Sequence, residues 1–100
     1  MPILEHALLD VKPGQEAAFE AAMRNAIPLI SAADGFLSLE VRPCVEDQGR
    51  YLLLVRWRSL EDHTQGFRGS PRYQEWKRLL HGFYDPFPIV RHFAEPIADA

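Results

Sequence analysis

The alternation of side chains along Tyr51–Trp57 predicts a β-strand that is apolar on both faces. Successive side chains of a strand point to opposite sides, so one face carries Tyr51, Leu53, Val55 and Trp57 and the other carries Leu52 and Leu54. A strand that is apolar on both faces needs cover on both. The rest of the chain supplies helices for one face only, so we expect a second copy of the protein to cover the other.

The same alternation predicts three further strands. Ile3–Val11 is also apolar on both faces, with one set of Ile3, Ala7, Leu9 and Val11 and an opposite set of Leu4 and Leu8. The apolar set of Phe36–Glu46 is Leu37, Leu39, Val41 and Val45. Pro43 has no N–H for a ladder, which places this strand at a sheet edge. Ile89–Glu95 is the last strand.

Two helical segments are predicted between these strands. The first has a single apolar stripe formed by Phe19, Ala22, Met23, Ala26, Ile27 and Ile30. Pro28 removes a backbone donor inside this pattern, so we expect a kink or an early end near Ala26. The second segment starts at the capping residue Ser59 and restarts at Ser70–Pro71 after two glycines. Its buried stripe is Tyr73, Trp76, Leu80 and Phe83.

The order of elements is β-α-β-β-α-β, the ferredoxin-like pattern of the α+β class. We expect a single domain over residues 1–100, with an antiparallel sheet and both helical segments on one face. Leu4, Leu8, Leu52 and Leu54 would then lie on the open face together with His6, which predicts a two-fold homodimer through that face.

Composition and charge exclude some classes of partner and some cellular compartments. A net charge of -3 argues against nucleic acid as a partner, and no apolar run approaches the ~20 residues of a membrane span. Met1–Glu5 has no basic region and is not a signal peptide. Cys44 is the only cysteine and reads as a structural thiol without a disulfide. We therefore expect a cytoplasmic protein.

Short motifs along almost the whole chain resemble one known family. They are Val11-Lys-Pro-Gly14 before a helix with Phe19, Asp34-Gly-Phe36, Trp57-Arg-Ser-Leu-Glu61, Phe67 with Ser70, and His92-Phe93. In their order and spacing the chain resembles the antibiotic biosynthesis monooxygenase family of dimeric α/β barrels. The resemblance implies a homodimer with a pocket between helices and sheet in each subunit. It also implies a cofactor-independent monooxygenase that oxidises a phenolic or quinone-like molecule with O₂.

The resemblance also suggests site residues. The tryptophan at the end of the third strand in anthrone-oxidising members corresponds to Trp57, and their asparagine on that face corresponds to Leu53. Their arginine and tyrosine fall at Lys77 and His63. The catalytic candidates are thus Trp57 in the pocket wall, His63 as the base and Lys77 beside the substrate anion. The candidates for substrate contact are Leu53, Phe67, Tyr73, Trp76 and Phe83.

Each of these residues also has a purely structural interpretation, and other functions stay open. Trp57 would serve equally well as a core aromatic, and His63 and Lys77 as surface residues. A non-catalytic dimer that binds a small ligand, or an isomerase or lyase, would use the same groups.

Cofactor binding is not expected. The haem-degrading branch of the fold has an asparagine, a tryptophan and a histidine at positions that correspond to Ala7, Phe67 and Lys77, so we disfavour haem, with His81 left as a shifted ligand. The histidines, His92 among them, show no metal-binding spacing, and there is no glycine-rich phosphate loop.

Overall fold

A computed structural model describes residues 1–100 as a sheet covered on one side by helices. The elements in chain order are β1 (Ile3–Asp10), α1 (Glu16–Ser31), β2 (Phe36–Pro43), β3 (Arg50–Trp57), the short helical segment η1 (Asp62–Phe67), α2 (Pro71–Leu80), the short helical segment η2 (His81–Phe83) and β4 (Val90–Phe93). No helix combines the length and apolar character needed to span a membrane.

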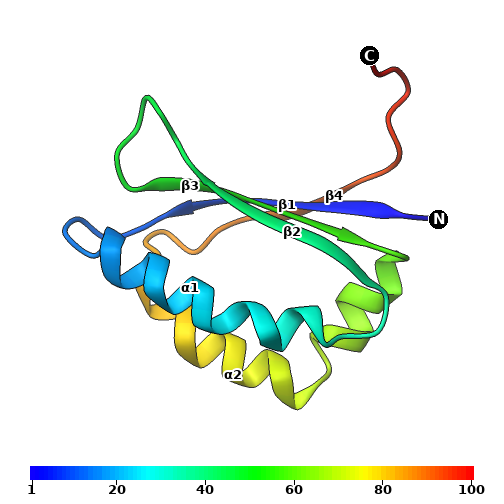
Figure 1. The fold of residues 1–100 in the computed structure, drawn as a ribbon, viewed down its shortest axis with the longest axis horizontal. Coiled ribbons are helices and arrows are strands. Elements are labelled where there is room, and N and C mark those ends of the chain that lie inside the picture. Colours follow the sequence, from blue (N-terminus) through cyan, green and yellow to red (C-terminus); the bar gives the residue numbers. More distant parts are fainter.

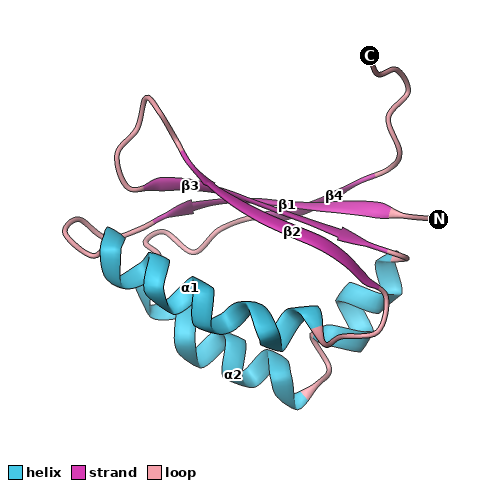
Figure 2. Cartoon of the chain, viewed as in Figure 1, coloured by secondary structure: helices cyan, strands magenta, loops and turns pink.

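The four strands lie in the order β2-β3-β1-β4, and each neighbouring pair is antiparallel. Both long helices cover the same face (Figures 1 and 2). This arrangement confirms the predicted α+β, ferredoxin-like fold. Strand β2 lies at an edge, as Pro43 predicted, because the missing N–H of proline costs a hydrogen bond only inside a sheet.

The core fills the layer between sheet and helices. The sheet contributes the inward side chains of β1 and β3 to this core. Helix α1 contributes Phe19, Met23, Ala26 and Ile30. Trp57, Phe19 and Phe67 are the largest side chains that are fully buried. The face of β3 that carries Tyr51, Leu53, Val55 and Trp57 therefore meets the helices, as the alternation predicted.

Three predicted elements have other bounds in the structure. The early end that was one of the two outcomes expected at Pro28 does not occur, since helix α1 continues through Pro28 to Ser31. Pro28 is exposed, so the backbone carbonyl that loses its helical partner can bond with water. Strand β2 ends at Pro43 rather than at Glu46, and Val45 is 95% exposed. An irregularity between Phe36 and Ser38 turns Leu37 away from the core. The last strand is Val90–Phe93 rather than Ile89–Glu95.

The opposite face of the sheet has no cover within the chain (Figure 1). Leu8 and Phe93 are 44% and 49% exposed there, and His6 packs edge-on against Phe93 at 5.8 Å. Leu52 lies opposite Leu8 and Leu54 opposite His6 across the β1–β3 pair, so these apolar side chains form one continuous patch.

Candidate active site

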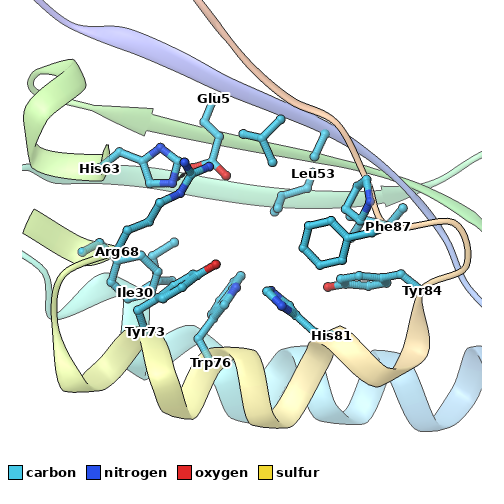
Figure 3. Close-up of a pocket in the computed structure, with 15 residues that line it drawn as sticks. Glu5, Ile30, Leu53, His63, Arg68, Tyr73, Trp76, His81, Tyr84 and Phe87 are labelled. Carbon is cyan, nitrogen blue, oxygen red and sulfur yellow. Dashed lines mark ion pairs between the residues drawn. The ribbon is translucent and has the colours of Figure 1, made fainter. Parts of the chain in front are cut away.

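A cavity of about 400 Å³ lies between the inner face of the sheet and helix α2 (Figure 3). Ten of its fifteen lining residues are hydrophobic, and they come from β1, β3, α1, η1, α2, β4 and the segment after η2. Leu53 of the sheet lies across the cavity from Trp76 of α2 (Figure 3). A mostly apolar cavity with a few polar groups is the usual form of a small-molecule site.

One end of the cavity is built around the buried carboxyl group of Glu5. Glu5 is 6% exposed, and the Nε1–H of Trp57 donates a hydrogen bond of 2.9 Å to its Oε1. The Nε2 of His63 lies 3.3 Å from the same oxygen. Burial raises the pKa of Glu5, against the opposing effects of the Trp57 hydrogen bond and the positive charge of Arg68. The carboxyl is therefore poised to hold or release a proton closer to neutral pH than an exposed glutamate.

His63 joins Glu5 to a second histidine. Its Nδ1 lies 2.8 Å from the Nε2 of His92, and its ring stacks on Trp57 at 5.1 Å. Burial, reinforced by Arg68 and His92, lowers the pKa of His63 to about 3. His63 is neutral at neutral pH, so its 3.3 Å contact with Glu5 is not an ion pair.

Arg68 adds a positive charge to the same end of the cavity. Its side chain lines the cavity and extends toward Glu5 and His63 (Figure 3). None of the salt bridges of the structure includes Arg68. An arginine that faces a cavity without a carboxylate partner can bind an anionic group of a ligand.

The wide turn of η1 explains why His63 and Arg68 meet at one place. The backbone N–H of Arg68 donates to the carbonyl of His63 at 3.1 Å, five residues earlier. Segments with this i→i+5 bond are rare and often occur at functional sites. The start of the segment is held by Ser59, whose Oγ accepts the backbone N–H of Asp62.

Hydroxyl and imidazole groups line the rest of the cavity. Tyr73, which lies beside Arg68, and His81 and Tyr84, which lie toward the other end, direct their polar atoms into the cavity (Figure 3). His81 packs edge-on against Phe87 at 4.9 Å, and burial together with the charge of Lys77 lowers its pKa. Burial raises the pKa of Tyr84. His81 and Tyr84 are therefore uncharged at neutral pH, and such groups suit the hydrogen-bonding oxygens of a neutral ligand.

The structure brings several of the predicted site residues together. His63, Leu53, Phe67, Tyr73 and Trp76 all line the cavity.

The other three predicted residues lie elsewhere. Trp57 is fully buried behind Glu5 and His63 and does not reach the cavity. Lys77 is exposed, with its Nζ 6.0 Å from the Tyr73 ring. Phe83 packs against Phe19 in the core at 5.9 Å.

Sequence reasoning missed Glu5, Arg68 and His92. Glu5 carried a signal, because it is the one charged residue among the inward positions of the first strand. Arg68 carried none, and the His92-Phe93 motif gave no role for His92, since their positions depend on the shape of η1 and on the pairing of β4. No group of three His, Cys, Asp or Glu side chains is placed to hold a metal ion.

The structure is a ferredoxin-like domain with a cavity between its sheet and helix α2. Residues 2–79 match the family described as antibiotic biosynthesis monooxygenase. The uncharacterised protein YczJ of Bacillus subtilis is 53% identical over 93 residues, which are 93% of this chain and 98% of that protein. The chain thus belongs to the antibiotic biosynthesis monooxygenase family, as its motifs suggested.

Solved structures share the architecture. A crystal structure of a protein assigned to this family from Bordetella bronchiseptica has a TM-score of 0.91 and 34% identity, over 96% of this chain and 98% of that one. SnoaB, a cofactor-independent oxygenase from Streptomyces nogalater, has a TM-score of 0.84 at 12% identity, over 97% and 95% of the two chains. At that identity, SnoaB supports the fold alone.

Proposed function

We propose that this protein is a cofactor-independent monooxygenase that oxidises a phenolic or quinol-type small molecule with O₂. The observation that carries the proposal is the pairing of a buried carboxyl group, Glu5, with the unpartnered cation of Arg68 at one end of an apolar cavity. Family membership and the likeness of the fold to SnoaB, a cofactor-independent oxygenase, support it.

Glu5 is the base in this proposal. Its Oε1 is held by Trp57 and His63, and no hydrogen bond occupies its second oxygen. When that oxygen takes a phenolic proton, negative charge moves from Glu5 to the substrate, where Arg68 stabilises the phenolate. The net charge of the site and its substrate is unchanged by this transfer. The substrate becomes an electron-rich phenolate.

The oxidation then needs no electrons other than those of the substrate. The anion transfers an electron to O₂, the two radicals combine into a peroxide at a ring carbon, and Glu5 returns its proton to that peroxide. The hydrogen of that ring carbon then leaves with the outer OH of the peroxide as water and a carbonyl remains, so one oxygen of O₂ enters the product and the other enters water. The walls that would hold the flat ring are Leu53, Phe67 and Trp76.

Oxygen consumption with anthrone and 1,4-naphthohydroquinone tests the proposal. The wild type should consume O₂ faster than the protein-free solution, in an amount equal to the product formed. Glu5→Gln removes the base but keeps a group that can accept the Trp57 hydrogen bond. We expect its kcat to fall by roughly 100-fold or more, while the exposed control Glu95→Gln keeps the wild-type rate.

Two results would contradict this function. Equal O₂ uptake by the wild type and Glu5→Gln would mean that Glu5 is not the base. Deuterium exchange into the substrate without any O₂ uptake would instead indicate an isomerase, which needs the same base and cation but no oxygen.

A further inference from the structure

The Glu5–His63 pair continues beyond the cavity. Glu5 and His63 line the cavity, whereas His92 does not and is only half-buried. His92 lies directly opposite Glu5 across the β1–β4 pair, and its Nε2 meets the Nδ1 of His63 at 2.8 Å. A row of three proton-carrying groups thus begins in the cavity and ends at a side chain that reaches solvent.

We propose that Glu5, His63 and His92 form a proton path through which Glu5 exchanges its proton with solvent while a ligand fills the cavity. The inference rests on the proposed function, in which Glu5 must be ionised before it can act as the base. A bound aromatic ring would exclude water from the cavity side of Glu5, so exchange has to use another route. The contact between His63 and His92 provides this route, because His92 does not line the cavity and reaches solvent.

Each transfer along the path moves one proton between two neighbouring polar atoms, which lie 3.3 Å apart for Glu5 and His63 and 2.8 Å apart for His63 and His92. The Oε1–H of protonated Glu5 passes to Nε2 of His63, the Nδ1–H of His63 passes to Nε2 of His92, and the Nδ1–H of His92 passes to water. Every O–H or N–H bond that breaks is matched by one that forms. The net change is a Glu5 carboxylate and a hydrated proton, and both histidines begin and end neutral.

The surrounding charges suit this division of roles. Arg68 is the charged side chain that acts on all three groups, and it disfavours a proton on either histidine. Burial also lowers the pKa of both histidines, while it raises the pKa of Glu5. Both rings therefore stay neutral and only carry the proton between Glu5 and solvent.

The first test uses nitrogen NMR of the histidine rings and does not depend on turnover. Protonated Glu5 donates from Oε1 to Nε2 of His63, which fixes the proton of His63 at Nδ1 and in turn shifts the proton of His92 to its own Nδ1. When Glu5 is ionised, both rings should hold their protons at Nε2 instead, so the two tautomers of the wild type should change together as the pH is lowered. In Glu5→Gln the amide oxygen faces both Trp57 and His63 at every pH, and both rings should keep the Nε2–H form. A His92 tautomer that does not change in the wild type, or that changes in the same way in Glu5→Gln, would show that the three groups are not coupled and would overturn the proposal.

The second test is kinetic and uses 1,4-naphthohydroquinone as the probe. Gln at position 92 can still hydrogen-bond to His63 but cannot pass a proton on. In weak buffer His92→Gln should lower kcat about tenfold with an unchanged KM, and added imidazole should restore the variant without affecting the wild type. A wild-type kcat, or a loss that imidazole does not relieve, would overturn the path.

The two tests separate this inference from the proposed function. If the wild type consumes no O₂ with any quinol, the monooxygenase proposal fails, and the tautomer measurement still decides whether the three groups are coupled. The NMR test also keeps His92 intact, so it remains decisive if His92→Gln does not fold.

Discussion

Glu5 and His63 respond to burial in opposite directions for the same physical reason. Removing water disfavours the charged form of each group, which raises the pKa of Glu5 and lowers the pKa of His63. The two neighbours, 3.3 Å apart, therefore do not form an ion pair at neutral pH. Trp57 contributes by donating to Glu5, so its place is behind the site rather than in the cavity wall.

The lowered pKa of His63 predicts how stability depends on pH. A histidine whose pKa is about 3 in the folded protein and 6.5 when unfolded stabilises the fold fully above pH 6.5, and this contribution is lost as the pH falls toward 3. Between pH 7 and pH 5 the loss from this one group is about 2 kcal/mol.

Chemical denaturation of the wild type and His63→Gln at the two pH values measures this contribution. The difference in unfolding free energy between them should shrink toward pH 5, since the variant lacks the titrating ring. His81 and His92 act in the same direction in both proteins and cancel in the comparison. A difference that does not change with pH would mean that His63 is protonated as easily in the folded chain as in the unfolded one.

For single residues, sequence patterns predicted apolar contacts better than polar ones. Phe67, Tyr73 and Trp76 line the cavity where helical spacing and family likeness placed them. The bond between His63 and His92 joins residues 29 positions apart, and it exists only because β4 pairs with β1 in one particular register. No local pattern encodes that register, so a polar contact across it could not be predicted.

Among the elements, η1 is the one that assembles the acid–base end of the cavity. Its start is fixed by Asp62, which accepts hydrogen bonds from the guanidinium of Arg58 and the hydroxyl of Ser59. These bonds lower the pKa of Asp62. Gly35 lies against the Asp62 side chain and has a φ of +81°, and its carbonyl accepts the backbone N–H of Arg58 at 2.7 Å.

Gly35→Ala should destabilise the protein more than Gly14→Ala does. Both glycines have positive φ angles, +81° and +82°, so each alanine costs about 1–2 kcal/mol of backbone strain. A Cβ at Gly14 meets nothing, whereas one at Gly35 overlaps Asp62. We expect an additional loss of about 1 kcal/mol or more from the displaced Asp62 hydrogen bonds.

Thermal or chemical unfolding of the two variants measures this difference. Gly35→Ala should also weaken binding of a quinol probe, since Asp62 fixes the segment that carries His63 and Arg68. Equal stability of the two variants would show that η1 does not depend on this contact.

Element types were more predictable than element ends. The period of the apolar residues identified all four strands and both long helices, and Pro43 identified the edge strand. Pro28 was misleading because its cost depends on exposure, which one sequence does not reveal. The irregularity near Leu37 arises from the pairing of β2 with β3, a long-range property.

For the whole molecule, the main unexplained surface is the open face of the sheet. We propose that two copies of the chain associate through it. Leu4, Leu8, Leu52 and Leu54 form its apolar centre, and charged side chains such as Arg56 and Arg91 surround it. A central apolar patch with a polar rim is the usual form of an interface between copies.

Leu8→Glu should convert a dimer to a monomer, because two buried carboxylates would meet near the two-fold axis without partners. Leu60→Glu is the matched control. Leu60 is 41% exposed, close to the 44% of Leu8, but it lies outside the strands of the sheet. Size-exclusion chromatography with light scattering measures both masses. A wild type that is monomeric at all concentrations would contradict the association.

The two ends of the cavity are encoded in separate parts of the chain, which has a consequence for divergence and engineering. The groups that handle protons come from β1, η1 and β4, while Tyr84, Phe87 and Pro88 belong to the connection between η2 and β4. Exchange of residues 84–88 for the matching loop of a relative would change the shape of the cavity without touching Glu5, His63 or His92. Under the proposed function, we expect such loop chimeras to differ in the molecules that they bind and to keep the same acid–base groups.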